Sequence, residues 1–246
     1  MDAAGEQEKF FLCRSAWAGS QRLGAAVWSG DIKSTFEVLA SQVRAGLNMA
    51  VSGIPWWTTD IGGFHSGDPS TPYFRELIVR WFQYGVFCPI FRLHGVRQPV
   101  SDQRLGGAAN EVWSFGDEAG TLISDLLRLR EKLRPYLMEQ MALAHEKGLP
   151  PMRPLFLDFP EDSVAWEIDD QFLFGPDVLV APVTARAVTS RSVYFPAGCE
   201  WVHAWSGAVY TGGGTASIRA PLEEIPVFVR KGKQLPGLEP APANRL

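Results

Sequence analysis

The sequence of 246 residues is long enough for one large domain or two modest ones, each with an ample hydrophobic core. Hydrophobic residues at 46% and charged residues at 20% are ordinary for a globular protein, and no run reaches the ~18 apolar residues of a membrane span. Because the formal net charge is −4, without the basic surface that nucleic acids favour, we expect neither a nucleic acid nor a membrane as partner.

Two short apolar runs open the chain, and each leads to a charged residue. Lys9–Cys13 predicts a strand that ends at Arg14, and Gly24–Trp28 predicts a second strand just before Asp31. The first residues lack a basic segment followed by an apolar one, so we expect no signal peptide and, by default, a cytoplasmic location.

A helix is expected after the second strand. Ser34 and Glu37 have the spacing of a capping box at its start, and Gly46 predicts its end. Apolar residues recur at intervals of three and four, as on one face of a helix: Ile32, Phe36, Leu39, Val43 and Leu47. The next apolar run, Leu47–Ser52, then predicts a third strand.

The loop over 53–72 is long and contains four glycines and three prolines. It ends at Thr71-Pro72, an N-cap residue followed by proline at the first helical position, so a second helix is expected to start there. Phe87–Leu93 then predicts a fourth strand, which ends at His94.

A long periodic run, Thr121–Lys147, predicts a helix that ends at Gly148 and that Pro135 kinks or splits in two. Strands that alternate with helices imply parallel pairing. We therefore predict that residues 1–149 form an α/β domain of the (β/α)8-barrel type.

The pattern changes near Pro151, where short β-like segments are separated by proline and glycine. These segments are Pro154–Phe159, Gln171–Phe174, Val178–Val183, Arg191–Phe195, Glu200–Ala204, Thr215–Ala220 and Ile225–Val229. They predict an all-β sandwich domain over 150–234, with a hairpin turn at the glycine run 212–214. The proline-rich stretch 235–246 is expected to be a disordered tail.

Four polar side chains follow the expected strands: Arg14, Asp31, Asp60 and His94. In a (β/α)8 barrel the carboxyl ends of the strands share one face, so we expect these side chains around a common hollow. Taken singly, each acid could equally be a helix cap or a loop-stabilising group, and His94 could be structural. Nine tryptophans, several of them beside these loops, can serve core packing or stack on sugar rings.

Carboxylates among aromatic rings are typical of sugar-processing sites, and glycosidases use two carboxyl groups across the scissile bond. Asp31 is the better general acid/base, because Trp28 can desolvate it and the small residues between them admit a substrate. Asp60 could be the second carboxylate or an acceptor for sugar hydroxyls. No spacing matches a metal site, so we expect no metal ligands.

With these residues in view, the chain resembles glycoside hydrolase family 31, the α-glucosidases and α-xylosidases, from about Phe10 to about Lys231. The motifs are Arg14-Ser15, Ala16-Trp17-Ala18-Gly19, Trp28-Ser-Gly-Asp31, Ser52-Gly-Ile-Pro-Trp-Trp-Thr-Thr-Asp60-Ile-Gly-Gly-Phe64, Arg92-Leu-His-Gly95, Phe174-Gly-Pro-Asp177 and Val180-Ala-Pro182. The resemblance implies a retaining hydrolase of terminal α-linked xylose or glucose, with an oligosaccharide or α-glycoside as substrate and no cofactor.

The resemblance also implies residue roles. Asp31 matches the general acid/base, and the residues that match the sugar-binding subsite are Arg14, Trp28, Trp57, Asp60, Phe64 and His94. In the family the nucleophilic Asp lies upstream on the fourth barrel strand, so the four strands here match strands five to eight. The chain is then the C-terminal half of the barrel, and its expected partner is the N-terminal half or a second copy.

Two alternatives stay open. The chain can be a non-catalytic carbohydrate-binding or assembly fragment, in which the tryptophans bind sugar and an exposed strand edge pairs with a partner. A transglycosylase would differ from a hydrolase only in the acceptor. The sequence does not decide between them, nor between xylose and glucose.

Overall fold

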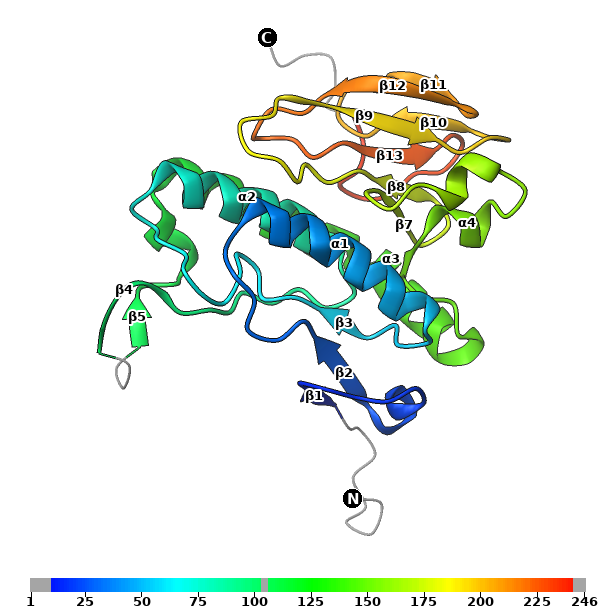
Figure 1. Cartoon of the computed structure of the whole chain (residues 1–246). Helices are drawn as coiled ribbons and strands as arrows, with labels where there is room; N and C mark the ends of the chain where they lie inside the picture. Colours follow the sequence, from blue (N-terminus) through cyan, green and yellow to red (C-terminus); the bar gives the residue numbers. More distant parts are fainter. Residues whose placement is uncertain (1–9, 103–105, 241–246) are drawn as a thin grey trace.

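The structure is a computed structural model, and it describes residues 10–102 and 106–240. The first strands form a parallel three-stranded sheet in the order β1-β2-β3, built from β1 (Phe11–Cys13), β2 (Ala25–Trp28) and β3 (Trp57–Thr58). This sheet lies on one side of the long helices, and the strands of the last third of the chain, yellow to red, lie on the other side (Figure 1). The first two predicted strands are confirmed to within a residue or two.

Helix α1 (Phe36–Val51) is longer than predicted. Thr35, rather than Ser34, caps it by accepting a hydrogen bond from the Val38 amide at 3.2 Å. The end predicted at Gly46 and the strand predicted over 47–52 are wrong, because the buried stripe continues through α1. Gly46 instead lets the helix approach Trp57, since a Cβ there would lie 2.8 Å from the indole nitrogen.

Helix α2 (Pro72–Val86) begins as predicted, and Thr71 accepts a hydrogen bond from the Phe74 amide at 3.2 Å. The strand predicted over 87–93 is wrong, apart from one parallel bridge between Ile61 and Leu93. The carbonyls of Cys88 and Pro89 accept hydrogen bonds from the Arg130 side chain at 2.8 and 3.0 Å. Arg130 thus ties the start of this segment to α3 (Asp117–Lys147), while further along the Ile90 amide donates to the Trp57 carbonyl at 3.2 Å.

Two further strands follow, and β4 (Arg97–Asp102) pairs with β5 (Gly106–Ala108). Helix α3 is continuous through Pro135, so of the two alternatives, a kink or a split, the split is wrong. Its end at Gly148, whose φ is 71°, is confirmed. The short helical turns are η2 (Ser20–Leu23), η3 (Val112–Phe115), α4 (Leu155–Asp158) and η4 (Ser163–Trp166). The strand predicted over 154–159 is therefore wrong, because α4 occupies it.

The C-terminal strands form two sheets. They are β6 (Met152–Arg153), β7 (Phe172–Phe174), β8 (Val178–Val180), β9 (Ser190–Phe195), β10 (Glu200–His203), β11 (Val209–Thr211), β12 (Gly214–Arg219) and β13 (Val227–Arg230). The larger sheet has the order β11-β10-β13-β8-β7-β6, and the smaller pairs β12 with β9. The glycine run 212–214 thus joins two sheets and is no hairpin turn.

Strands β7, β8 and β13 of the six-stranded sheet are buried on both faces. Along β8, Val178 and Val180 pack into the core shared with the helices, whereas Leu179 packs toward the β9–β12 pair. This alternation follows from the two-residue period of a strand. Leu235 and Leu238 also pack into the helix core, so the disorder predicted from 235 is wrong as far as residue 240. Residues 241–246 lie outside the described part.

Candidate active site

The parallel order of the first sheet brings the ends of β1, β2 and β3 to one edge. Arg14 directly follows β1, Asp31 comes three residues after β2, and Asp60 comes two residues after β3. The backbone amide of Ile61 donates to the Arg92 carbonyl at 3.2 Å, which places the segment before His94 beside this edge. The fold therefore gathers the segments that the sequence singled out.

Arg14 and Asp31 form an ion pair across the first two strand ends. The Arg14 Nη1 to Asp31 Oδ2 distance is 3.0 Å, and the side chains are 62% and 36% exposed. The φ of Gly30, +75°, favours glycine, and the guanidinium of Arg14 lies over this residue. The carboxyl of Asp31 is thus open to solvent and paired with a cation. This differs from the expectation that Trp28 shields it from water.

Asp60 has the opposite surroundings. Its side chain is fully buried, and Oδ1 accepts a charge-assisted hydrogen bond from Arg92 Nη2. Among the described residues, nothing donates to Oδ2. Burial raises the pKa of this carboxyl above its ordinary value of 3.8, with a smaller contribution from the Asp31 charge, while the charges of Arg92 and His94 oppose the shift.

Aromatic rings surround these charges. The Arg92 guanidinium lies 5.7 Å from the centroid of the Trp28 ring, within the range of a cation–π contact. The rings of Phe64 and His94 are 5.4 Å apart, and the Phe64 amide donates to the Ile32 carbonyl at 2.7 Å, next to Asp31. Six of the seven predicted site residues therefore meet at this edge.

Trp57 is the seventh, and it lies elsewhere. Its indole is buried between β3 and α1, where its nitrogen faces Gly46. The structure thus places it behind the strand and not among the charged groups.

Two arginines near this edge are missing from the sequence-based site. Arg92 pairs with Asp60, and its place two residues before His94 in the sequence is a usable signal. Arg97 is fully buried and binds backbone carbonyls of the loop after Asp60 and of His94. The local pattern does not identify it, because its shortest carbonyl contacts, with Gly63 and Ile61, are more than thirty residues away in the chain.

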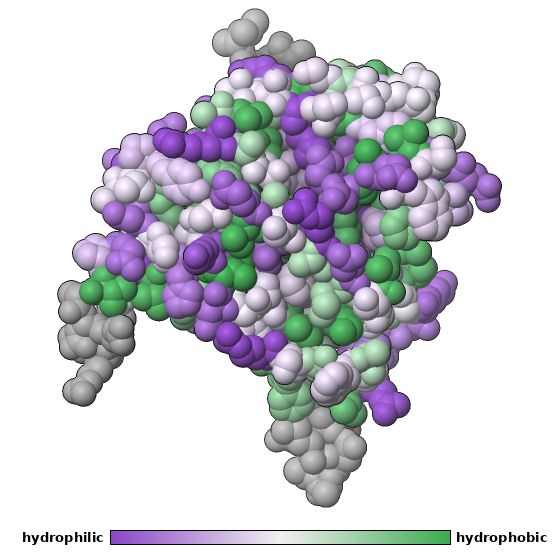
Figure 2. Space-filling model, in the orientation of Figure 1, coloured by the Kyte–Doolittle hydropathy of each residue, from purple (hydrophilic) through white to green (hydrophobic). Residues whose placement is uncertain are grey.

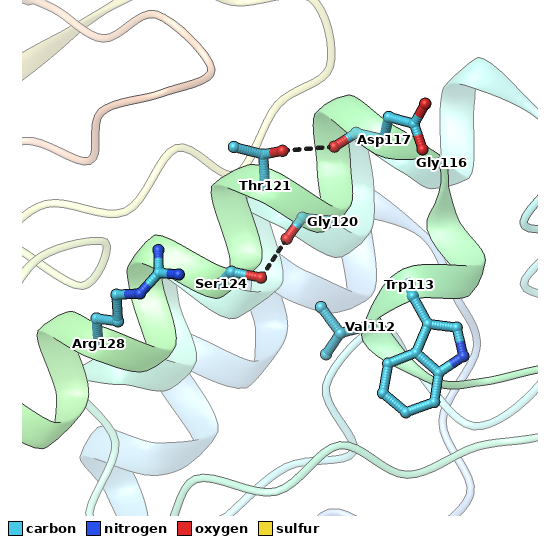
Figure 3. Close-up of a pocket in the computed structure, with 8 residues that line it drawn as sticks. All are labelled: Val112, Trp113, Gly116, Asp117, Gly120, Thr121, Ser124 and Arg128. Carbon is cyan, nitrogen blue, oxygen red and sulfur yellow. Dashed lines mark hydrogen bonds between the residues drawn. The ribbon is translucent and has the colours of Figure 1, made fainter.

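A hollow of about 490 Å³ lies along α3, away from these residues (Figure 3). Its hydroxyls are occupied, because Thr121 donates to the Asp117 carbonyl at 2.8 Å and Ser124 to the Gly120 carbonyl at 2.7 Å. None of the predicted site residues lines it. Across 10–102 and 106–240 we find no group of three metal-binding side chains and no helix both long and apolar enough to cross a membrane.

Two family models match the chain. The glycosyl hydrolases family 31 TIM-barrel domain matches residues 1–140, and the glycosyl hydrolase family 31 C-terminal domain matches residues 148–235. Among curated relatives, the alpha-xylosidase of Saccharolobus solfataricus is 42% identical over 225 residues, which cover 92% of this chain and 29% of the relative. Alpha-glucosidase 2 of Bacillus thermoamyloliquefaciens is 38% identical over 226 residues, covering 92% and 27%.

Solved structures agree with these matches. A GH31 alpha-xylosidase from a soil metagenome, complexed with xylose, is 53% identical, with a TM-score of 0.91 over 94% of this chain and 36% of that one. A GH31 dextranase of Flavobacterium johnsoniae, complexed with glucose, is 38% identical, with a TM-score of 0.83 over 92% and 27%. The chain thus spans about a third or less of the length of these relatives.

Proposed function

Since this chain belongs to glycosyl hydrolase family 31, we propose that it forms part of a retaining α-glycosidase that releases terminal α-linked xylose or glucose. Asp31 is the general acid/base in this proposal. The second carboxyl group that a retaining mechanism requires is, by family resemblance, an Asp on an upstream strand outside this sequence. The strands β1, β2 and β3 and the bridge at Leu93 are then barrel strands five to eight, with the barrel over 1–149 and the sandwich over 150–234.

The buried Asp60 carboxylate is the observation that carries the proposal. Its Oδ2, together with the Arg92 Nε and Trp28 Nε1 atoms, is buried and has no partner among the described residues. Leaving such atoms unpaired costs ~1–3 kcal/mol each, so their gathering next to an aromatic ring fits a ligand with several hydroxyl groups. A sugar ring supplies those hydroxyls and an apolar face for the indole.

The proposed roles of the other residues follow from how exposed each side chain is. Asp31 is open to water and paired with Arg14, so it can exchange a proton with solvent and with a leaving-group oxygen. Phe64 and His94 form a wall next to it. Trp57 supports the site from behind, because its indole fixes β3 against α1.

A fluorescence titration of the 246-residue chain with xylose and with glucose tests the sugar site. We expect a saturable change in tryptophan emission. The affinity derived from it should be at least about tenfold weaker for Asp60→Asn, because a hydrogen bond to a charged group is lost. Trp113→Phe is the matched control, since that indole is 80% exposed and outside the site. No saturable change, or one that Asp60→Asn leaves unaltered, would refute the proposed site.

In the whole enzyme, Asp31→Ala should lower turnover of a natural glycoside by about 10²–10⁴-fold, because the leaving oxygen is no longer protonated. An activated nitrophenyl glycoside needs less help from an acid and should be largely spared. Equal losses on both substrates would contradict the acid/base role.

The non-catalytic alternative rests on β1, where Phe11 and Leu12, together with the preceding Phe10, are exposed. Such an edge favours pairing with another chain. Assay of the 246-residue chain on nitrophenyl α-xyloside and α-glucoside separates the two: sugar binding without turnover supports a binding or assembly fragment, whereas turnover supports a complete catalytic site.

A further inference from the structure

Arg97, the first residue of β4, is a fully buried cation beside the candidate site. Its Nη1 donates to the Gly63 carbonyl at 2.7 Å, and its Nη2 donates to the Ile61 carbonyl at 3.1 Å. Both carbonyls belong to the turn that directly follows Asp60. One guanidinium thus holds both ends of this short turn.

The same guanidinium also reaches the second loop of the site. Its Nη2 lies 3.5 Å from the His94 carbonyl, and its Nε donates to Asn110 Oδ1 at 2.6 Å. Asn110 in turn donates to the Gly95 carbonyl at 3.3 Å. The loop carrying Asp60 and the loop carrying His94 are therefore fastened to one side chain.

The surroundings are shaped to admit this side chain. A Cβ at Gly62, Gly67 or Gly95 would lie 3.0, 2.9 or 2.9 Å from a guanidinium nitrogen. The ring of Phe74 lies below, 4.8 Å from Cζ. The same Cβ atoms would lie still closer to Ile78, Phe74 and the Gly63 carbonyl, so glycine at these three places keeps the whole pocket around Arg97 open.

Burying this cation is expensive, and desolvation lowers the pKa of Arg97 to about 10. The side chain stays charged at neutral pH, and its charge lowers the pKa of Asp60 in opposition to burial. The acceptors named above are neutral oxygens, which compensate a buried charge less well than a carboxylate does. An apolar side chain could fill the same volume without that cost, so a role beyond packing is indicated.

We propose that Arg97 is a positioning residue that fixes Asp60 and His94 relative to each other by clamping the carbonyls of their two loops. The inference rests on the proposed sugar site. It goes beyond that site by assigning its geometry to a residue that does not itself line it.

Arg80 on α2 provides a matched control. It is also fully buried, burial also lowers its pKa to about 10, and its guanidinium also donates to carbonyls, those of Ala220 and Pro221 at 2.8 and 3.0 Å. Those carbonyls belong to the C-terminal sandwich, away from the site. Arg97→Lys and Arg80→Lys both keep the charge and lose the planar fork.

The experiment compares amide hydrogen exchange and xylose and glucose affinity in the two variants, at a temperature where both are folded. In Arg97→Lys we expect exchange at Gly63 and Phe64 to rise by about tenfold or more, and sugar affinity to fall by a similar factor, as loss of ~1.4 kcal/mol of local stability implies. Arg80→Lys should change neither. Asn110→Ala removes only the acceptor of the Arg97 Nε hydrogen bond, so it should raise exchange and lower sugar affinity by smaller factors. It replaces Arg97→Lys in the test if that variant does not fold.

Equal exchange at Gly63 and Phe64 in the Arg97 and Arg80 variants would overturn the proposal, since Arg97 would then serve only global stability. Unchanged sugar affinity in a variant with faster local exchange would also overturn it. If the unmodified chain binds no sugar, the proposed function fails. The exchange comparison still tests whether Arg97 clamps the two loops.

Discussion

The two main sheets differ in how completely they are covered. Strands β7, β8 and β13 of the larger sheet are buried on both faces, whereas at β1 Phe10 is 65% exposed and Phe11 and Leu12 are each 37% exposed. Figure 2 shows apolar residues at the surface around this end of the molecule. The candidate site lies at the end of the less covered sheet, so chemistry and packing are concentrated in different regions.

The two regions are also held together by different interactions. Aromatic edge-to-face contacts such as Phe87 with Phe174, 5.7 Å apart, dominate where helices meet the larger sheet. At the site, ion pairs and arginine–carbonyl bonds do this work, as with Asp60, Arg92 and Arg97. Directional bonds fix polar groups at defined places, which apolar packing alone does not.

The largest effect should come from the covered sheet. Phe174→Ala should lower the free energy of unfolding by about 3–5 kcal/mol, because the ring is fully buried between helix and sheet. Leu12→Ala at β1 should cost about 1 kcal/mol or less. Urea unfolding of both variants measures the difference. Similar losses in the two variants would show that the exposed strand β1 contributes as much to the free energy of unfolding as the covered sheet does.

His203 on β10 should make the sandwich sensitive to acid. Burial lowers its pKa below 6.5, so the unfolded chain binds a proton first as pH falls. Its contribution is therefore intact above about pH 6.5 and is lost as pH falls through the lowered value, at no more than about 1.4 kcal/mol per pH unit. His203→Gln should flatten this part of a stability–pH curve. A curve with the same slope in the variant would assign the acid sensitivity to other groups.

The pH dependence of stability at Asp60 should have the opposite sign to that at His203. Its folded pKa is raised, so the folded state holds the proton more tightly than the unfolded chain does. Stability from this group is present below 3.8 and is lost as pH rises through the raised value. Relative to Asp60→Asn, the wild-type chain should therefore weaken as pH rises above about 4. If the free energy of unfolding changed with pH in the same way for the wild-type chain and for Asp60→Asn, the raised pKa of a buried Asp60 would be contradicted.

Local sequence signals predicted elements well where the cause is local. Thr71 and Pro72 start α2 as expected, because an N-cap and a first-turn proline act within one turn. Gly46 was misread, because its meaning depends on Trp57, eleven residues away. Within the segment 87–93, predicted as a strand, the carbonyls of Cys88 and Pro89 bind the side chain of Arg130, a contact more than forty residues away that the local pattern does not show.

The site follows the same division. The end of β2 was predicted and leads to Asp31, and parallel pairing brings such residues to one edge. Asp60 lies at the same edge although the strand expected before it, over 47–52, is helical and β3 was not predicted. The sequence could not show that Asp60 is the desolvated acid and Asp31 the exposed one, because burial depends on loops from the whole sheet edge. Arg97 went unnoticed for the same reason.

The smallest effect on folding should come from Arg14→Ala. Its ion pair with Asp31 is largely exposed, and such pairs contribute ~0–1 kcal/mol to the free energy of unfolding. If the site binds sugar, however, the variant should lose affinity for xylose and glucose far beyond that change in stability, because Asp31 loses its partner at the strand end. Lys231→Ala, which breaks a similarly exposed pair with Glu200 among the C-terminal strands, is the control and should leave sugar affinity unchanged. If both variants kept the same affinity for xylose and glucose, Arg14 would be an ordinary surface cation and would not belong to the candidate site.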